Sequence, residues 1–242
     1  MTTGSFDLRE DECKDCKLIM YADDFTICSP IFWHSTNSHI SKAHESLLLW
    51  SSEKHFQLNV QKCKTMVIRR TLDCSPVVLD EVSVVKELKL LGVTLNNRGN
   101  WTDHINKIVL QASRNLYVIR VLRQSLSKDH LITVYNAVVR SVLEYASPLF
   151  AGLNKKESLK MERVQRRFHR ILCGGQCDEH EFPSLAERRE LAAIKLFNKA
   201  KSSDHILNAL LPPVTSSGRF CFLTTQIYET FTFFFPPRCS SP

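Results

Sequence analysis

Residues 17–28 of this 242-residue chain read KLIMYADDFTIC. Two short runs of apolar, β-prone residues flank Asp23 and Asp24, which is the pattern of a tight antiparallel hairpin with an acidic turn. Two adjacent carboxylates repel each other, whereas a divalent cation such as Mg²⁺ would hold both of them ionised and use their oxygens as ligands. The alternative is a solvated Asp-Asp turn, which is the commonest role of this dipeptide.

The segments that follow the hairpin combine a helical period with short strands. Apolar residues recur at helical spacing from Ser38 to about Phe56, which predicts an amphipathic helix that packs on the hairpin's sheet. Residues 64–68 and 89–95 are strand candidates, and Gly92 interrupts the second of them.

After Trp101 the sequence changes from mixed strands to helices. We expect Thr102 to cap a first helix, Ser127 to cap a second and Ser184 to open a fourth that runs towards Leu207. The expected buried positions are Ile105, Ile108, Val109, Ala112, Leu116 and Ile119 in the first helix; Leu131, Tyr135, Val138, Val142 and Tyr145 in the second; and Leu159, Val164, Phe168 and Ile171 in a third that begins at Lys155.

The predicted fold class is therefore α+β, with a domain boundary near Trp101. Residues 1–16 form a polar lead-in, 17–100 the mixed domain, 101–211 an all-helical domain, and 212–242 a tail without either period that we expect to be unpacked.

Composition narrows the range of functions. The chain has 32 Lys and Arg against 25 Asp and Glu, and the resulting charge of +7 favours a polyanionic partner such as nucleic acid. Nine cysteines in no repeating frame, without an apolar signal segment, argue against a secreted disulfide scaffold. We therefore expect reduced thiols and an intracellular protein, in nucleus or cytoplasm. The sequence has no run of the roughly 18 apolar residues that a membrane-spanning helix needs.

Several motifs resemble reverse transcriptases of non-LTR (LINE-type) retrotransposons. LIMYADDF at 18–25 resembles their palm motif, LNVQKCKTM at 58–66 the next block, and LLGV at 90–93 the hairpin that grips the primer. Trp101 and His104 at a helix start, SVLEYASP at 141–148 and ERVQRRF at 162–168 resemble the thumb. The resemblance covers about residues 17–205.

This resemblance implies a partial polymerase palm, formed by a β-hairpin and short antiparallel strands with one packed helix, followed by an all-helical thumb. The implied reaction is RNA-directed DNA synthesis by two-metal nucleotidyl transfer with Mg²⁺. Asp23 and Asp24 would be the catalytic metal ligands, Lys62 would lie near the triphosphate, and Tyr21 and Gly92 would contact nucleic acid. From the residues alone, Lys62 could as well be a surface lysine on a strand edge. Gly92 could as well mark a bulge in its strand.

The thumb-like region is rich in basic residues. By resemblance, Arg163, Arg166, Arg167 and Arg170 would contact phosphates of an RNA template and DNA primer, independently of sequence. The alternative is a solvated helix face. Further basic residues that fit this role are Arg114, Arg120, Arg123, Arg140 and Lys160.

The family's third catalytic carboxylate and its fingers have no counterpart before Tyr21. Asp7, Asp11 and Asp15 lie in a segment without a strand pattern. We therefore expect an inactive fragment that exposes apolar surface at the edge of its palm sheet. Two alternatives stay open: a non-catalytic nucleic-acid-binding protein that uses the thumb, or an enzyme completed by another chain that supplies the missing carboxylate.

Two cysteines and two histidines near the end of the third helix are competent zinc ligands. Their spacing matches no common zinc signature, so we expect that Cys173, Cys177, His169 and His180 bind no metal.

Overall fold

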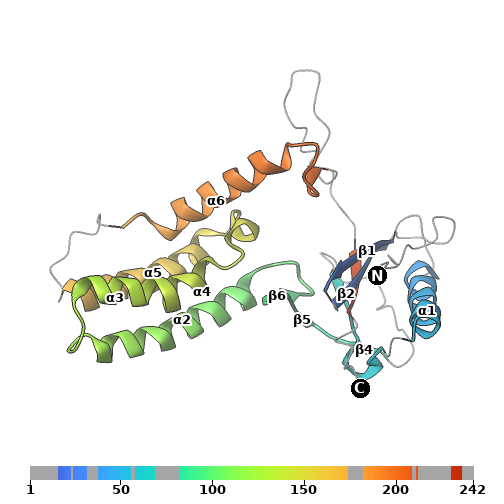
Figure 1. Cartoon of the computed structure of the whole chain (residues 1–242), viewed down its shortest axis with the longest axis horizontal. Helices are drawn as coiled ribbons and strands as arrows, with labels where there is room; N and C mark the ends of the chain where they lie inside the picture. Colours follow the sequence, from blue (N-terminus) through green and yellow to red (C-terminus); the bar gives the residue numbers. More distant parts are fainter. Residues whose placement is uncertain are drawn as a thin grey trace. The chain divides into compact units, whose positions relative to one another are not determined.

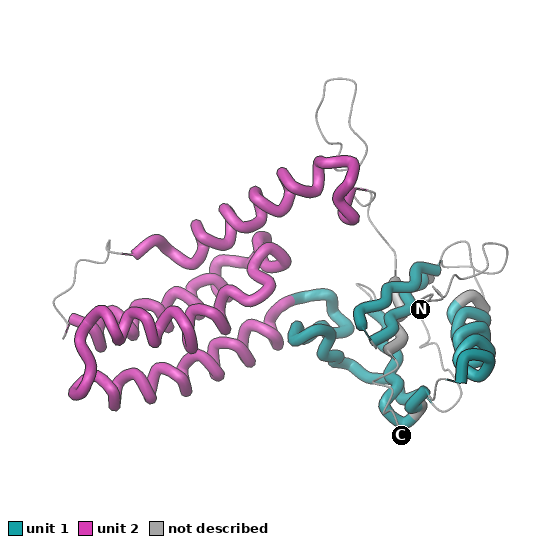
Figure 2. The backbone as a smooth tube through the Cα atoms, in the orientation of Figure 1, with its two compact units in different colours: residues 1–100, 226–242 teal, residues 101–225 magenta. Residues whose placement is uncertain are grey.

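The computed structural model describes residues 16–22, 24–31, 38–55, 58–68, 82–173, 182–208, 211 and 230–235. The fold is α+β, as the sequence predicts. The chain divides into two compact units, residues 1–100 with 226–242 and residues 101–225 (Figure 2). The division after Asn100 falls where the strand pattern gives way to the helical one.

Unit 1 is built on a five-stranded sheet with the order β1-β2-β7-β3-β4. Strands β1 and β2 form the predicted hairpin at one edge (Figure 1). Strand β3 begins and ends where the sequence places it. The strands are β1 (Lys17–Tyr21), β2 (Asp24–Ile31), β3 (Lys64–Ile68), β4 (Ser83–Val84) and β7 (Thr230–Phe235).

Strand β7 lies in the middle of this sheet. It is antiparallel to β2 on one side and to β3 on the other, over five residue pairs each. The prediction of an unpacked tail was therefore wrong for residues 230–235. Their Thr and Phe side chains favour strands, and β2 and β3 run parallel to each other with the width of one strand between them. Pairing of this kind joins distant segments, so a local period does not reveal it.

Helix α1 (Ser38–Glu53) confirms the predicted amphipathic helix and ends three residues before Phe56. Phe25 of β2 meets Trp50 of α1 edge-on, with ring centroids 5.9 Å apart. The buried core of unit 1 comprises Phe25, Ile27, Ile40, Ala43, Leu47, Cys63 and Val82.

The strand candidate around Gly92 is a separate hairpin. Strands β5 (Glu87–Leu90) and β6 (Val93–Asn96) pair antiparallel through a two-residue turn. Leu91 and Gly92 have φ values of 45° and 86°, the left-handed backbone that two-residue hairpin turns favour. Gly92 therefore serves a turn rather than a bulge.

Unit 2 is all helical, as predicted. Ser127 caps α3, and Ser184 and Glu187 form a capping box at the start of α6. The fourth helix ends at Ala200 rather than near Leu207. The elements are α2 (Thr102–Leu122), α3 (Lys128–Tyr135), η2 (Asn136–Arg140), α4 (Ser141–Glu144), η3 (Ser147–Phe150), α5 (Lys155–Cys173) and α6 (Leu185–Ala200).

The prediction that Thr102 caps α2 was wrong. Trp101 occupies the cap position, and Thr102 is the first helical residue. The hydroxyl of Thr102 donates to a carboxylate oxygen of Glu157 in α5 instead of capping its own helix. A partner distant in sequence thus displaced a local hydrogen bond.

The core of unit 2 lies between α2, α3 with α4, and α5. Tyr135 and Phe168 stack at its centre, with ring centroids 3.9 Å apart and planes 9° from parallel. The core residues include Ile105, Ala112, Leu116, Ile119, Leu131, Tyr135, Val139, Leu143, Met161, Val164, Phe168 and Leu172. Leu159, expected to be buried, is 39% exposed.

A π-helical turn, η2, changes which residues of the second helix are buried. Val138 and Tyr145, expected in the core, are 39% and 53% exposed, whereas Val139 and Leu143 are fully buried. A π turn holds more residues than an α turn, so it rotates the following residues around the helix axis. The α-helical period used for the sequence prediction does not include this rotation.

Candidate functional site

The first hairpin forms as predicted, but its turn lies one residue earlier than the sequence placed it. Strands β1 and β2 pair from Lys17 opposite Cys28 to Tyr21 opposite Asp24, which leaves a two-residue turn. Ala22 in this turn has a φ of 53°, in the left-handed region typical of such turns. Asp23, the other predicted metal ligand, lies outside the described residues.

Asp24 is therefore at the tip of the hairpin, half-buried, across from Tyr21, which is 64% exposed. A carboxylate is the hard oxygen ligand that Mg²⁺ prefers, so Asp24 has suitable chemistry for the predicted ion. Within the described part of the chain, no three His, Cys, Asp or Glu side chains gather into a metal site.

Within the described part of the chain, no ion pair joins Lys62 to Asp24. Lys62 is exposed and ends the short 3₁₀ helix η1 (Val60–Lys62), and its backbone N–H donates to the carbonyl of Asn59 over 3.1 Å. The ion pairs found among the described residues include neither Lys62 nor Asp24. Gly92 is exposed in the turn between β5 and β6.

Two thiols near this sheet, those of Cys28 and Cys63, are poor nucleophiles and poor metal ligands. Burial, with a smaller contribution from Cys16, raises the pKa of Cys28 to about 12, and burial raises the pKa of Cys63 to about 11. Both groups therefore remain protonated at neutral pH, which indicates a packing role.

The possible zinc ligands also have other roles. Cys173 is disulfide-bonded, which contradicts the expectation of a reduced thiol at this position and removes the thiolate that zinc ligation needs. Cys16, Cys28 and Cys63 are free, as expected. His169 is buried and stacks on Phe182 with centroids 4.8 Å apart. Cys177 and His180 lie outside the described residues.

One side of α5 carries an unbroken row of basic residues, here called the basic row: Lys156, Lys160, Arg163, Arg167 and Arg170. Their spacing of four, three, four and three residues places them on one face of the helix. At about 1.5 Å per residue, the row extends over about 21 Å. Arg166 is exposed at its side. The opposite face of α5 is buried and comprises Glu157, Met161, Val164, Gln165, Phe168, His169 and Leu172.

Among the described residues, the arginines of this face have no carboxylate partner. Arg163, Arg166, Arg167 and Arg170 are all exposed, and none takes part in an ion pair or side-chain hydrogen bond with another described residue. Lys160 donates from Nζ to Oδ1 of Asn106 over 2.6 Å. Their charge is therefore available to an anionic partner.

Helix α5 is held between α2 and α6. On the α2 side, Glu157 accepts from Thr102. On the α6 side, Oε1 of Glu162 accepts from the backbone N–H of Ala186 over 2.9 Å, and Arg189 donates to Oγ of Ser158 over 2.9 Å. Burial lowers the pKa of Arg189, and Glu162 opposes this effect. These contacts orient the basic row away from the core.

The SVLEYASP motif has a structural role. Glu144 forms a bidentate pair with Arg188 of α6, in which Nη2 to Oε2 is 3.0 Å, and a longer contact of 3.7 Å with Arg140. Arg140, one of the predicted phosphate contacts, therefore has a carboxylate partner already. Ala146 has a φ of 54°, and Pro148 is at the start of η3.

Trp101 and His104 also pack rather than face solvent. Both rings contact Phe150, with centroids 4.9 Å and 5.0 Å away. Burial, with a contribution from Lys107, lowers the pKa of His104, which favours the neutral ring.

Two exposed residues beside the predicted ones were missed by the sequence analysis. Lys156 belongs to the basic row, and its spacing from Lys160 would have found it. Tyr117 of α2 is 68% exposed, and its position outside the predicted buried stripe of that helix would have indicated this.

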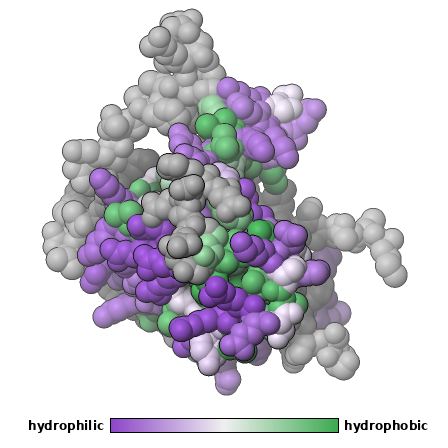
Figure 3. Space-filling model, turned by 90° about the vertical axis from the view of Figure 1, so that its left-hand side faces the viewer, coloured by the Kyte–Doolittle hydropathy of each residue, from purple (hydrophilic) through white to green (hydrophobic). Residues whose placement is uncertain are grey.

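The surface also carries exposed apolar side chains. Figure 3 shows one face on which hydrophilic side chains predominate and hydrophobic ones lie between them. The expected apolar surface at the sheet edge is present on β1, where Ile19, Met20 and Tyr21 are 56%, 56% and 64% exposed. Among the described helices, none is long and apolar enough to cross a bilayer.

Comparison with models of protein families, with curated proteins and with solved structures finds no match to this chain.

Proposed function

We propose that this chain is a reverse-transcriptase-like polypeptide whose working part is the helical unit, which binds nucleic acid through the basic row of α5. The observation that carries this proposal is the row itself: five cations on one helix face, four of them exposed, of which the arginines lack any carboxylate partner among the described residues. Contacts of this kind are made to phosphates and do not depend on base sequence.

The size of the row sets the expected salt dependence. Neutralising five phosphates of a duplex gives a slope of about −4.5 in a plot of log affinity against log salt concentration. A rise in salt from about 50 mM to about 200 mM should then weaken binding by about 500-fold.

Fluorescence anisotropy with a labelled RNA–DNA duplex over a salt series tests this proposal. The variant Arg163→Gln/Arg167→Gln should reduce the slope to about −2.7, since two phosphate contacts are lost. The matched control is Lys195→Gln/Lys199→Gln, which removes the same charge from exposed positions of α6. Equal slopes for the two variants would contradict the proposal, because binding would then follow net charge alone.

A second candidate function is nucleotidyl transfer, which is supported by the hairpin that presents Asp24 opposite Tyr21. Asp23 and Asp24 would hold Mg²⁺, which in such enzymes activates the attacking hydroxyl and steadies the leaving pyrophosphate. We infer that the chain alone does not catalyse this reaction, because two carboxylates hold the ions less tightly than three.

Homopolymer-templated dNTP incorporation in Mg²⁺ tests this inference, with Asp23→Asn/Asp24→Asn as the control. Incorporation that disappears in the control would show that this chain or a second copy of it supplies a third carboxylate. Incorporation that appears only with an added complementary chain would support an enzyme assembled from two parts.

A further inference from the structure

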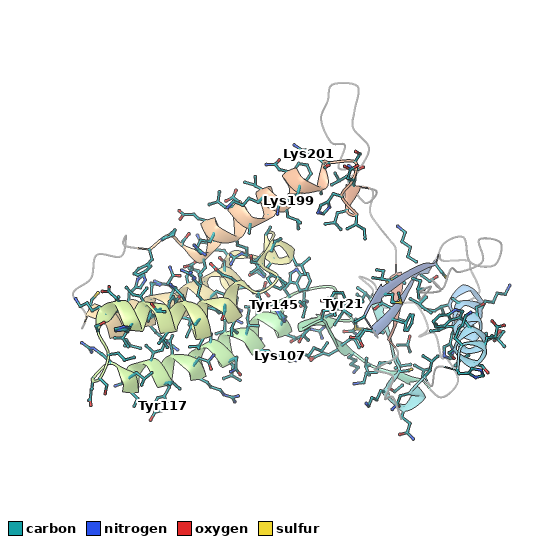
Figure 4. The ribbon with its side chains drawn as sticks, viewed as in Figure 1. Tyr21, Lys107, Tyr117, Tyr145, Lys199 and Lys201 are labelled. Atoms are coloured by element: carbon teal, nitrogen blue, oxygen red, sulfur yellow. The ribbon has the colours of Figure 1, made fainter. Side chains whose placement is uncertain are left out.

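Helix α2 exposes an aromatic ring between two arginines. Tyr117 is 68% exposed, and Arg114 and Arg120, three residues before and after it, are exposed as well. Residues three apart on a helix are neighbours, with about 5–6 Å between their Cβ atoms. Figure 4 shows Tyr117 projecting from α2 on the side away from α3. The ring is thus accessible and flanked by positive charge.

This ring lies on the flank of α2 that adjoins α5. Thr102 and Asn106 touch α5 through Glu157 and Lys160, so the two helices run parallel with their first turns aligned. Tyr117 follows Asn106 by eleven residues, which is close to three helical turns and returns to the same side of α2.

The same alignment places Tyr117 near the end of the basic row. The contacting pairs differ by 55 and 54 positions in the sequence. An offset of 54 sets Ser113 beside Arg167 and Tyr117 beside Ile171, the residue that follows Arg170. Aromatic and basic side chains therefore form one surface across α2 and α5.

A surface of this composition fits a single strand better than a duplex. Single-stranded nucleic acid presents phosphates together with base faces that stack on exposed aromatic rings, and its binding sites combine a basic groove with such rings. A blunt duplex presents the same phosphates but keeps its bases stacked inside. Leu110 and Val121, which are 53% and 58% exposed on the outer side of α2, extend the apolar part of this surface.

We propose that Tyr117 stacks on an unpaired base of a single strand whose phosphates lie along Arg114, Arg120 and the basic row. The protein then binds a single strand, or a single-stranded overhang beside a duplex, more tightly than a blunt duplex of equal length. This inference rests on the proposed nucleic-acid binding and names the form of nucleic acid that the site selects.

The test measures binding of the full chain and of Tyr117→Ala to three probes: a single-stranded oligonucleotide, the same strand with abasic sites, and a blunt duplex. Tyr117→Ala should weaken binding to the intact single strand by about tenfold. Binding to the abasic strand and to the duplex should not change. The salt slope for the single strand should also stay the same, because no phosphate contact is lost.

Two further variants separate stacking from structure. Tyr117→Trp keeps an aromatic ring and should retain wild-type affinity. Tyr145→Ala removes a similarly exposed tyrosine, which follows the end of α4 and is 53% exposed (Figure 4). This variant should bind all three probes with wild-type affinity.

Each other outcome overturns the inference. Equal losses on all three probes would mean that Tyr117 supports the fold, and no loss would mean that it does not stack. If Tyr117→Ala instead disrupts a dimer seen by sedimentation, the surface is a protein interface. If the wild-type chain binds none of the probes, the proposed function fails as well; if it binds all three equally, only this inference fails.

Discussion

Replacing Phe168 with alanine should remove the centre of the helical unit. The Phe168 side chain is fully buried, stacks on Tyr135 at 3.9 Å and meets Phe182 edge-on at 6.5 Å. Phe→Ala at such a site costs about 3–5 kcal/mol, and loss of the aromatic pair argues for the upper part of this range. This loss is a large fraction of the roughly 5–15 kcal/mol that stabilises a typical domain.

Thermal unfolding followed by circular dichroism at 222 nm measures this loss, because α1 is the only α-helix described in unit 1 and the signal therefore comes mainly from unit 2. A loss of about 4 kcal/mol lowers Tm by roughly 15–30 °C in a domain of about 100 residues. Tyr117→Ala is the control, since truncation of an exposed ring stays within about 0.5 kcal/mol. A change in Tm of less than about 4 °C for Phe168→Ala would refute the packing described for α3 and α5.

The same variant separates stability from binding. Phe168 and the basic row lie on opposite faces of α5. At a temperature where the variant remains folded, its affinity for nucleic acid should equal that of the wild type. A loss of affinity without a loss of helical signal would show that the two faces are wrongly assigned.

Arg188→Gln should destabilise unit 2 by about 1–2 kcal/mol, because it removes a charge-assisted bidentate pair. A double-mutant cycle with Glu144→Gln, measured by urea unfolding, should show coupling between the two residues. Additive losses of stability would contradict the pair. The lowered pKa of His104 makes the folded state bind its proton less readily than the unfolded state, so stability should fall as the pH drops below the ordinary value of 6.5. Urea titrations at two pH values measure this loss of stability, which should be smaller for His104→Phe than for the wild type. An equal loss in the two proteins would show that another group causes it. A chain that ends at Leu211 lacks β7 and leaves β2 and β3 with unpaired inner edges. Light scattering should therefore detect aggregation of this shortened chain. A stable monomer would show that β7 is dispensable.

Features that depend on neighbours in sequence were predictable. The first hairpin, the caps at Ser127 and Ser184, and the apolar stripe of α2 result from contacts within a few residues. Their side-chain types and spacings were therefore enough to locate a hairpin, the helices and the change from mixed strands to helices after Asn100.

Contacts between distant segments decided the rest. The place of β7 between β2 and β3 required a strand of matching length from a distant part of the chain. Thr102 donates a hydrogen bond to Glu157 of another helix instead of capping its own helix.

The candidate interface divides in the same way. The spacing of Arg163, Arg167 and Arg170 placed them on one face from sequence alone, because a helix has a fixed period. Only the packed structure showed that these arginines have no carboxylate partner among the described residues, that Arg140 has one, and that Tyr117 is exposed beside α5. The physical reason is that charge neutralisation and solvent exposure depend on which surfaces meet across the fold, and a local pattern does not contain that information.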